Sequence, residues 1–267
     1  MSVAEGVLRR ERLVVGAALV ALCLLSWSYL LRGAGMGMDA WAMTHLALFP
    51  HRAADAMAAM AAPEISSITV VAMWWIMMIG MMTPSAAPLV LLYARVMRHA
   101  STHASRPTYA STAALAAGYL LVWLGFSVVA TAMHYLLQAA GLMSPGMLWS
   151  RSAVLSAAIL AAAGLYQLTP LKHACLRHCR GPVEFLARHR RTGRSGALLM
   201  GMQHGIWCIG CCWALMGLLF VGGVMNLVWV ALLALLVLAE KLTPHGMIVG
   251  RVTGLVLIAW SLATLLA

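Results

Sequence analysis

Residues 197–220 read ALLMGMQHGIWCIGCCWALMGLLF. The run contains no Asp, Glu, Lys or Arg, and it reaches the roughly 20 apolar residues that a helix needs to cross the hydrocarbon core of a bilayer. It also holds one histidine and three cysteines, which are ligands for soft metal ions. The stretch therefore predicts a membrane-spanning helix that carries metal ligands.

The rest of the chain has the same apolar character. Of its 267 residues, 63% are hydrophobic and 9% are charged, whereas a soluble domain has about 25% charged residues. This composition predicts an all-α, polytopic transmembrane helix bundle, folded as a single domain over residues 1–267, and excludes a soluble globular enzyme. About seven spans are expected, at 13–31, 69–94, 110–137, 152–170, 197–220, 225–240 and 248–266.

Membrane topology is sufficient to explain the formal net charge of +11. If the N-terminus lies inside, only Arg32, Arg52 and Arg151 fall on the outer side, and the other fifteen of the 18 Lys and Arg residues lie inside. Short loops rich in Lys and Arg stay on the cytoplasmic side of a membrane. The asymmetry predicts an N-terminus inside, a C-terminus outside and lipid around the spans, and no nucleic-acid partner is needed to explain the charge.

Two loops between the expected spans have distinctive compositions. The outer loop, 32–68, contains potential soft ligands: Met36, Met38, Met43, Met57, Met60, His45 and His51. The inner loop, 171–196, is basic. Its first part, 171–180, is expected to continue the fourth span beyond the membrane until Gly181 and Pro182 end the helix.

Soft ligands on the fifth expected span fall on one helical face. Residues four apart are neighbours on a helix surface, and they form the series Met200, His204, Cys208, Cys212 and Met216, with Cys211 beside it. Four glycines occur along the same helix: Gly201, Gly205, Gly210 and Gly217. Small residues let a neighbouring transmembrane helix approach closely, so the ligand stripe is expected to face protein.

The second expected span carries methionines in two parallel registers. Met77 and Met81 are four residues apart, as are Met78 and Met82. Pro84 follows and interrupts the helical hydrogen bonds, and nearby Ser and Thr hydroxyls can satisfy the groups that it frees. The spacing predicts a row of thioethers above a kink in the helix.

A third group of ligands lies in the expected inner loop. In KHACLRHCR, residues 172–180, Cys175 and Cys179 share one helical face, and the neighbouring cations Lys172, Arg177 and Arg180 favour thiolates. At the inner end of the sixth span, the adjacent residues Glu240 and Lys241 are expected to form an ion pair at the membrane interface.

The chemistry of these side chains favours a soft metal ion. Thiolates and thioethers prefer Cu(I), and zinc binds where four thiolate or imidazole groups converge. Calcium and magnesium require oxygen ligands, but spans two to five contain no carboxylate. The candidate metal ligands are Met77, Met78, Met81, Met82, Cys175, Cys179, His204, Cys208, Cys211, Cys212 and Met216.

Four stretches together resemble a bacterial family of predicted metal-binding integral membrane proteins of unknown function. They are MWWIMMIGMMTPSAAPL (73–89), YQLTPLKHACLRHCRGP (166–182), HGIWCIGCCWALM (204–216) and GVMNLVWVALLALLVLAEK (223–241), and the resemblance covers about 65–265. It implies a multi-pass protein of the bacterial inner (cytoplasmic) membrane. It also implies roles for the Met and Cys ligands and for Pro84, Lys172, Arg180, Gly210, Trp213, Met225, Asn226, Glu240 and Lys241.

Three functions are compatible with these patterns. In the first, Cu(I) is captured by the outer loop, held or passed between spans two and five, and delivered inside through Cys175 and Cys179 to a metallochaperone or metalloenzyme. This hypothesis needs no catalytic residue, and the chain has no nucleotide-binding motif to drive transport. The second is a thiol–disulfide or quinone-linked redox enzyme that uses Cys208 and Cys211. The third is a membrane subunit that supports maturation of a metalloenzyme partner.

Overall fold

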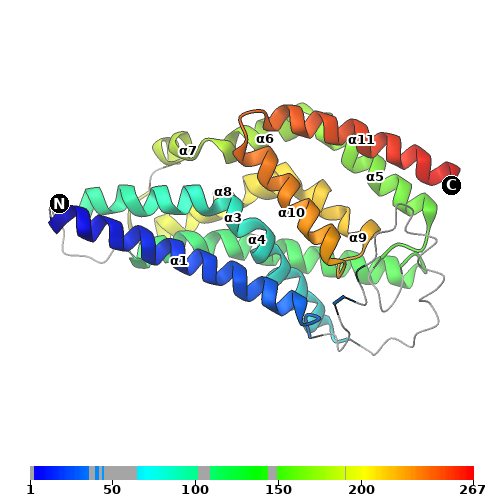
Figure 1. The fold of residues 1–267 in the computed structure, drawn as a ribbon, viewed down its shortest axis with the longest axis horizontal. Helices are drawn as coiled ribbons and strands as arrows, with labels where there is room; N and C mark the ends of the chain where they lie inside the picture. Colours follow the sequence, from blue (N-terminus) through cyan, green and yellow to red (C-terminus); the bar gives the residue numbers. More distant parts are fainter. Residues whose placement is uncertain are drawn as a thin grey trace.

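The protein is an elongated bundle of helices with its two termini at opposite ends (Figure 1). A computed structural model describes residues 3–35, 40–41, 44, 65–101, 109–143, 149–189 and 191–267, with the side chains of 3–12 and 99–101 excepted. These residues form α1 (Val3–Leu31), α3 (Ser67–Ser101), α4 (Tyr109–Ala139), α5 (Ala153–Leu168), α6 (Pro170–Arg180), α7 (Pro182–His189), α8 (Gly193–Gly217), α9 (Leu219–Gly222), α10 (Leu227–Leu242) and α11 (Gly246–Leu266). The all-α prediction is confirmed.

Among the residues that the structure describes, five helical segments are long and apolar enough to cross a membrane. They are Leu13–Leu31, Ser67–Arg98, Tyr109–Ala139, Gly193–Gly222 and Gly246–Leu266. A sixth crossing arises if the bent pair α5 and α6 counts as one span. Within the described residues the expected count of seven is not reached, because α10 has only 16 residues, fewer than the roughly 20 that a membrane crossing needs.

The expectation that residues 171–180 extend the fourth span is wrong. The axes of α5 and α6 differ by 66°, because the Thr169 side chain accepts a hydrogen bond from the backbone N–H of Lys172 and so caps a new helix that has Pro170 in its first turn. Helix α6 then ends at Arg180, as predicted, and Gly181 follows it. Most of the expected inner loop is therefore helical, in α6, α7 and the start of α8.

Helices α4 and α8 approach each other closely through glycine. A side chain at Gly118 would meet the Leu198 carbonyl, and one at Gly201 would meet the Leu115 carbonyl. Contact of this kind between small residues is a common way for transmembrane helices to pack. The predicted role of Gly201 is confirmed, whereas Gly217 has open space around it.

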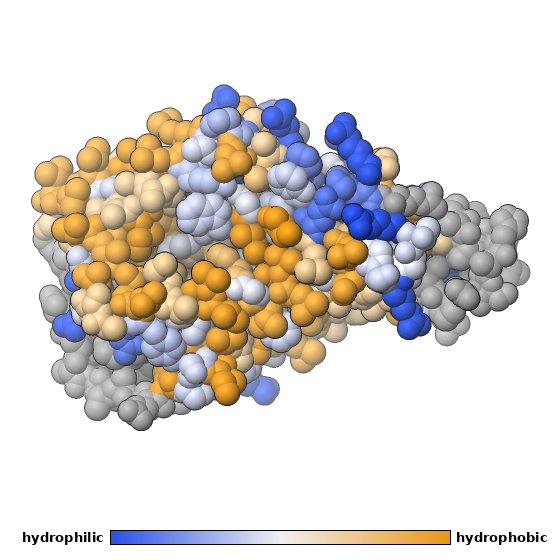
Figure 2. Space-filling model, turned by 180° about the vertical axis from the view of Figure 1, so that it is seen from behind, coloured by the Kyte–Doolittle hydropathy of each residue, from blue (hydrophilic) through white to orange (hydrophobic). Residues whose placement is uncertain are grey.

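Apolar residues cover much of the face shown in Figure 2, and hydrophilic residues gather towards the end that holds α6 and α7. Leucines on the outer helices are well exposed, among them Leu25, Leu136, Leu165 and Leu255. An apolar exterior over long helices is the surface that lipid chains contact. Helices α1, α4, α5 and α11 therefore have the exterior of membrane-embedded elements.

The glycine contact between α4 and α8 predicts a position-specific effect on stability. Gly118→Ala should destabilise the protein by about 1–3 kcal/mol, because the added carbon is forced against the α8 backbone. Gly125→Ala, one heptad further along α4, meets nothing within 4 Å and should be neutral or slightly stabilising. Thermal unfolding of the two detergent-purified variants checks this, and equal midpoints would contradict the packing.

Candidate metal centre

Five buried cysteines from α6 and α8 lie together, and we call them the thiol cluster: Cys175, Cys179, Cys208, Cys211 and Cys212. Helix α6 packs against α8, so its cysteines are part of the core rather than a separate group at the inner surface. All six cysteines of the chain, including Cys23 of α1, are free thiols.

Gly210 allows α6 to reach α8 at this point. The space that a side chain would occupy at Gly210 lies 2.9 Å from Cys175 Sγ, so any larger residue would displace that thiol. The hydroxyl of Tyr166 donates a hydrogen bond to the Gly210 carbonyl and fixes the end of α5 to the same turn. Further along α6, Cys179 is buried in the same core as Cys208 and Cys211 of α8.

Cys208 is the centre of the cluster. Its Sγ lies 3.1 Å from the Tyr119 hydroxyl of α4 and 2.9 Å from Lys241 Nζ of α10. The thiols of Cys211 and Cys212 both donate to the Cys208 carbonyl, at 3.1 Å and 3.0 Å. Three helices, α4, α8 and α10, therefore meet at one sulfur atom that is fully buried.

The predicted ion pair between Glu240 and Lys241 is wrong, because these neighbours point to different partners. Glu240 pairs with Lys172 of α6 at 2.6 Å and accepts a hydrogen bond from Gln167 Nε2 at 2.7 Å. Lys241 donates to Cys208 and, at 3.1 Å, to Ser85 of α3.

Two lysines that were expected among the charges of the inner loops are buried. The side chains of Lys172 and Lys241 are buried inside the bundle, so they are not loop charges and do not contribute to the predicted charge asymmetry. Lys172 does not serve as a cation for Cys175 and Cys179, because its ammonium is engaged by Glu240. Lys241, from the opposite side, is the ammonium that faces the thiols.

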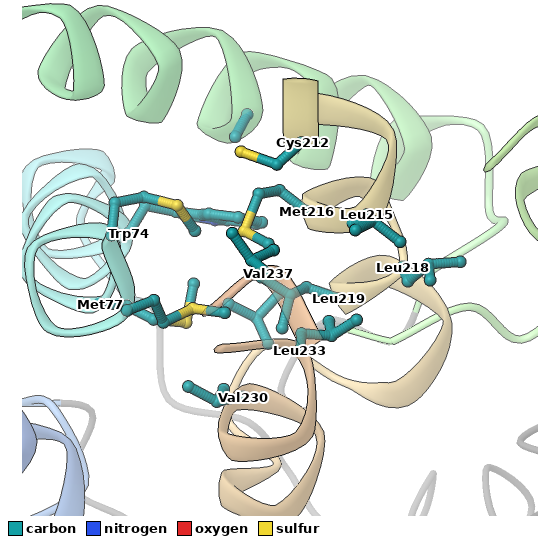
Figure 3. Packing of buried hydrophobic residues seen from close by; sticks show 14 of the residues in the cluster. Trp74, Met77, Cys212, Leu215, Met216, Leu218, Leu219, Val230, Leu233 and Val237 are labelled. Carbon is teal, nitrogen blue, oxygen red and sulfur yellow. The ribbon is translucent and has the colours of Figure 1, made fainter. Parts of the chain in front are cut away.

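The methionines of α3 belong to the same buried core as the thiol cluster. The side chains of Met77, Met78, Met81 and Met82 are at most 2% exposed, and Met216 of α8 is fully buried. Figure 3 shows Met77 pointing from α3 towards the interior that Cys212 and Met216 face from α8. The thioethers of α3 and the thiols of α8 therefore belong to one buried core, and passage of an ion between spans two and five stays a prediction.

The α3 helix is continuous through Pro84, which lies in its interior. The Ser85 hydroxyl donates to the Met82 carbonyl at 2.9 Å, and the Tyr119 hydroxyl lies 3.3 Å from the same oxygen. The polar environment predicted beside the proline is therefore supplied partly by Ser85 and partly by another helix.

His204 lies one turn before Cys208 on α8 and is buried. Its ring is 5.8 Å from that of Tyr119 and 5.3 Å from that of Phe185 in α7, between centroids. Within the described part of the chain, its Nδ1 has no hydrogen-bond partner. Because no hydrogen bond occupies this buried Nδ1, His204 is a candidate metal ligand.

The site is not a finished metal cage. Among the described residues, no three His, Cys, Asp or Glu side chains are arranged to hold a metal ion. Zinc–sulfur bonds are about 2.3 Å long, so binding of a metal at the cluster requires the cysteine side chains to move.

Tyr119, which contacts Cys208, and Ser85, which contacts Lys241, were not selected by the ligand patterns. The signal for Tyr119 was a phenol in the middle of an apolar span, since a buried tyrosine hydroxyl usually has a polar partner. The outer-loop ligands Met36, Met38, Met43, His45, His51, Met57 and Met60 lie outside the described residues.

A family model described as a copper chaperone, PpoB2, matches residues 71–264. The chain belongs to the PpoB2 copper chaperone family. No curated protein and no solved structure matches it. The matched residues of this PpoB2-family chain include every candidate ligand in α3, α6 and α8. Membership of the family supports a copper-related function, in agreement with the metal preference expected from thiols and thioethers.

The buried pair between Lys172 and Glu240 predicts a large loss of stability when one partner is removed. Lys172→Met leaves the Glu240 carboxylate without a counter-charge and should destabilise the protein by about 3–5 kcal/mol, and Lys172→Met/Glu240→Leu should recover much of it. Arg188→Met breaks a pair with Glu184 whose side chains are 70% and 65% exposed, so it should change stability by less than about 1 kcal/mol. Thermal unfolding compares them, and similar effects of both single changes would contradict the assignment.

Proposed function

We propose that this protein binds Cu(I) at the thiol cluster within a membrane and passes it to a metallochaperone or metalloenzyme partner. The observation that supports this most directly is the packing of α6 against α8, which buries Cys175 and Cys179 in the same core as the three cysteines of α8. Cysteines that the sequence separates by almost thirty residues become one group of soft ligands. The membership of a copper chaperone family agrees with that chemistry.

The ligand types favour Cu(I) over zinc at this position. Cu(I) is a soft cation bound well by thiolates and thioethers, whereas structural zinc sites need four ligands in a tetrahedral arrangement. Among the described residues, no set of four such ligands is arranged in this way. The neighbouring methionines can add thioether ligands without bringing further charge into the interior.

Charge balance provides a second argument. A Cu(I) ion held by two thiolates carries a net charge of −1, which is unfavourable in an apolar interior unless a cation compensates it. The ammonium of Lys241 lies 2.9 Å from Cys208 Sγ and is held by Ser85 at 3.1 Å. With Lys241 in place, the loaded site is neutral overall.

The ligands on α8 also support movement of the ion rather than storage alone. His204, Cys208, Cys212 and Met216 recur every four residues and are all buried. At 1.5 Å per residue they extend over about 18 Å of the helix axis. An ion can pass between successive ligands at such spacing, from the methionine side to the histidine side or in reverse. With the N-terminus inside a bacterial inner membrane, the histidine side is cytoplasmic.

The redox alternative has less support from the geometry. All six thiols are free, and Cys208, Cys211 and Cys212 are at most 1% exposed. Thiol–disulfide exchange requires access of the attacking thiolate to the substrate disulfide. A role in the maturation of a metalloenzyme partner is compatible with copper delivery and differs only in the identity of the recipient.

Metal content tests the thiol cluster directly. We expect detergent-purified wild type to contain copper near one equivalent, and Cys208→Ser/Cys211→Ser/Cys212→Ser to lose at least nine-tenths of it, because a hydroxyl is a poor ligand for Cu(I). Cys23→Ser, which removes a thiol of α1 outside the cluster, should retain copper. Elemental analysis of the three proteins is the measurement.

The same samples discriminate between the functions. Equal metal in the wild type and the triple variant would remove the cluster as the copper site, and zinc in place of copper would change the metal assignment. A mixed disulfide trapped on Cys208 or Cys211 of metal-free protein would favour redox chemistry. A fixed partner that co-purifies with the protein would favour the maturation role.

Lys241 offers a separate test of charge balance. Lys241→Met should weaken the retention of Cu(I) by at least about tenfold, equivalent to 1.4 kcal/mol, because the loaded dithiolate loses its counter-charge. Lys241→Arg keeps the charge and should retain more of the affinity. Competition with a Cu(I) chelator measures both variants, and equal losses in the two would show that Lys241 acts by shape and not by charge.

A further inference from the structure

A pocket with a volume of about 400 Å³ lies beside α6 and α7, outside the thiol cluster. Its wall includes His178, Phe185 and His189, and its charged residues are Arg177, Glu184 and Arg188. The side chains of Glu184 and Arg188 are mostly exposed, which places the pocket at the hydrophilic end of the bundle visible in Figure 2. This charged surface is suited to water and to soluble molecules.

Both histidines of the pocket are held in the same way. His178 Nδ1 lies 2.9 Å from the Ala174 carbonyl oxygen, and His189 Nδ1 lies 3.1 Å from the Phe185 carbonyl oxygen. A carbonyl only accepts hydrogen bonds, so each Nδ1 carries a proton, and the tautomer that this contact selects has its lone pair on Nε2. A metal-binding histidine is typically oriented by a hydrogen bond from its other nitrogen. The pocket therefore has two imidazoles whose Nε2 atoms are ready to bind.

Aromatic contacts connect the pocket with the interior ligands. The His189 ring stacks on the Phe185 ring with 4.8 Å between their centroids. The Phe185 ring also contacts the ring of buried His204, with 5.3 Å between centroids. His178 stacks on Trp207 at 4.2 Å with an interplanar angle of 6°, and Trp207 directly precedes Cys208. The pocket histidines are thus separated from the buried ligands by a single aromatic layer.

We propose that this pocket is the transfer site at which Cu(I) exchanges between the protein and a soluble thiol carrier, with His178 and His189 as transient ligands. The inference rests on the proposed copper function. Two imidazoles do not complete a metal cage, so a carrier can supply the remaining ligand during exchange. A carrier that holds Cu(I) by two thiolates is anionic, and Arg177 at the wall of the pocket complements that charge. His204 is the next ligand inwards.

The first experiment measures transfer separately from storage. Full-length protein loaded with Cu(I) is mixed without oxygen with an excess of bicinchoninate, and formation of the coloured Cu(I) complex is followed. His178→Ala/His189→Ala should retain the copper content of the wild type but release it at least tenfold more slowly. His245→Ala is the matched control, because this exposed histidine lies in the loop bound by Arg180 but outside the pocket, and its release should be unchanged.

Equal release rates in the double variant and the wild type would overturn the proposal. Loss of copper from the double variant would also overturn it, since the histidines would then belong to the storage site. Thermal unfolding confirms that the variant is folded, and His178→Gln/His189→Gln replaces it if the alanines lower the midpoint.

The second experiment tests the pocket without the thiol cluster. In Cys208→Ser/Cys211→Ser/Cys212→Ser, Ag(I) serves as a redox-inert probe for Cu(I), and modification of individual histidines by diethyl pyrocarbonate is read by mass spectrometry. Ag(I) should slow modification of His178 and His189 at least threefold and leave His245 unchanged. No protection would overturn the pocket site. If Ag(I) protects the two histidines in this variant but the wild type purifies without copper, the pocket is supported as a metal site and the proposed copper function is rejected.

Discussion

The arrangement of the interior depends on the contact between Lys241 Nζ and Cys208 Sγ, which are 2.9 Å apart in a region closed to solvent. An ammonium in an apolar core is strongly unfavourable unless polar or anionic groups surround it. Here Ser85 and Cys208 provide those contacts, while the adjacent Glu240 is engaged by Lys172. The two charged residues at the end of α10 therefore connect this helix to α3, α6 and α8.

That arrangement depends in turn on the break between α5 and α6. A straight continuation of α5 would carry Cys175 and Cys179 away from α8, and Lys172 away from Glu240. The cap by Thr169 with Pro170 turns the chain by 66°, and Gly210 leaves room for Cys175. The bend between α5 and α6 thus positions both the thiol cluster and the buried ion pair. The ion pair that stabilises the site and the cysteines that form its ligands therefore depend on the same bend.

Local patterns were sufficient for much of the structure. The periodicity of Met77, Met81, Cys208 and Cys212 was read along single helices, where the spacing of neighbours is set by the helix itself. Orientation of the ligands towards protein followed from the glycines of α8. The partners of Lys241 were not accessible in this way, because Ser85 and Cys208 lie 156 and 33 residues away in the chain and nothing in the neighbouring residues specifies them.

The sequence by itself determined that the chain is an apolar helical bundle and which side chains are soft ligands, since hydrophobicity and side-chain chemistry are properties of residues and of single helices. Only the tertiary structure decided that α6 turns back against α8, that Lys241 faces a thiol and not its neighbour Glu240, and that α10 is shorter than a full span. Those outcomes depend on capping geometry and on the need to neutralise buried charges across helices, and both act between residues that are distant in sequence.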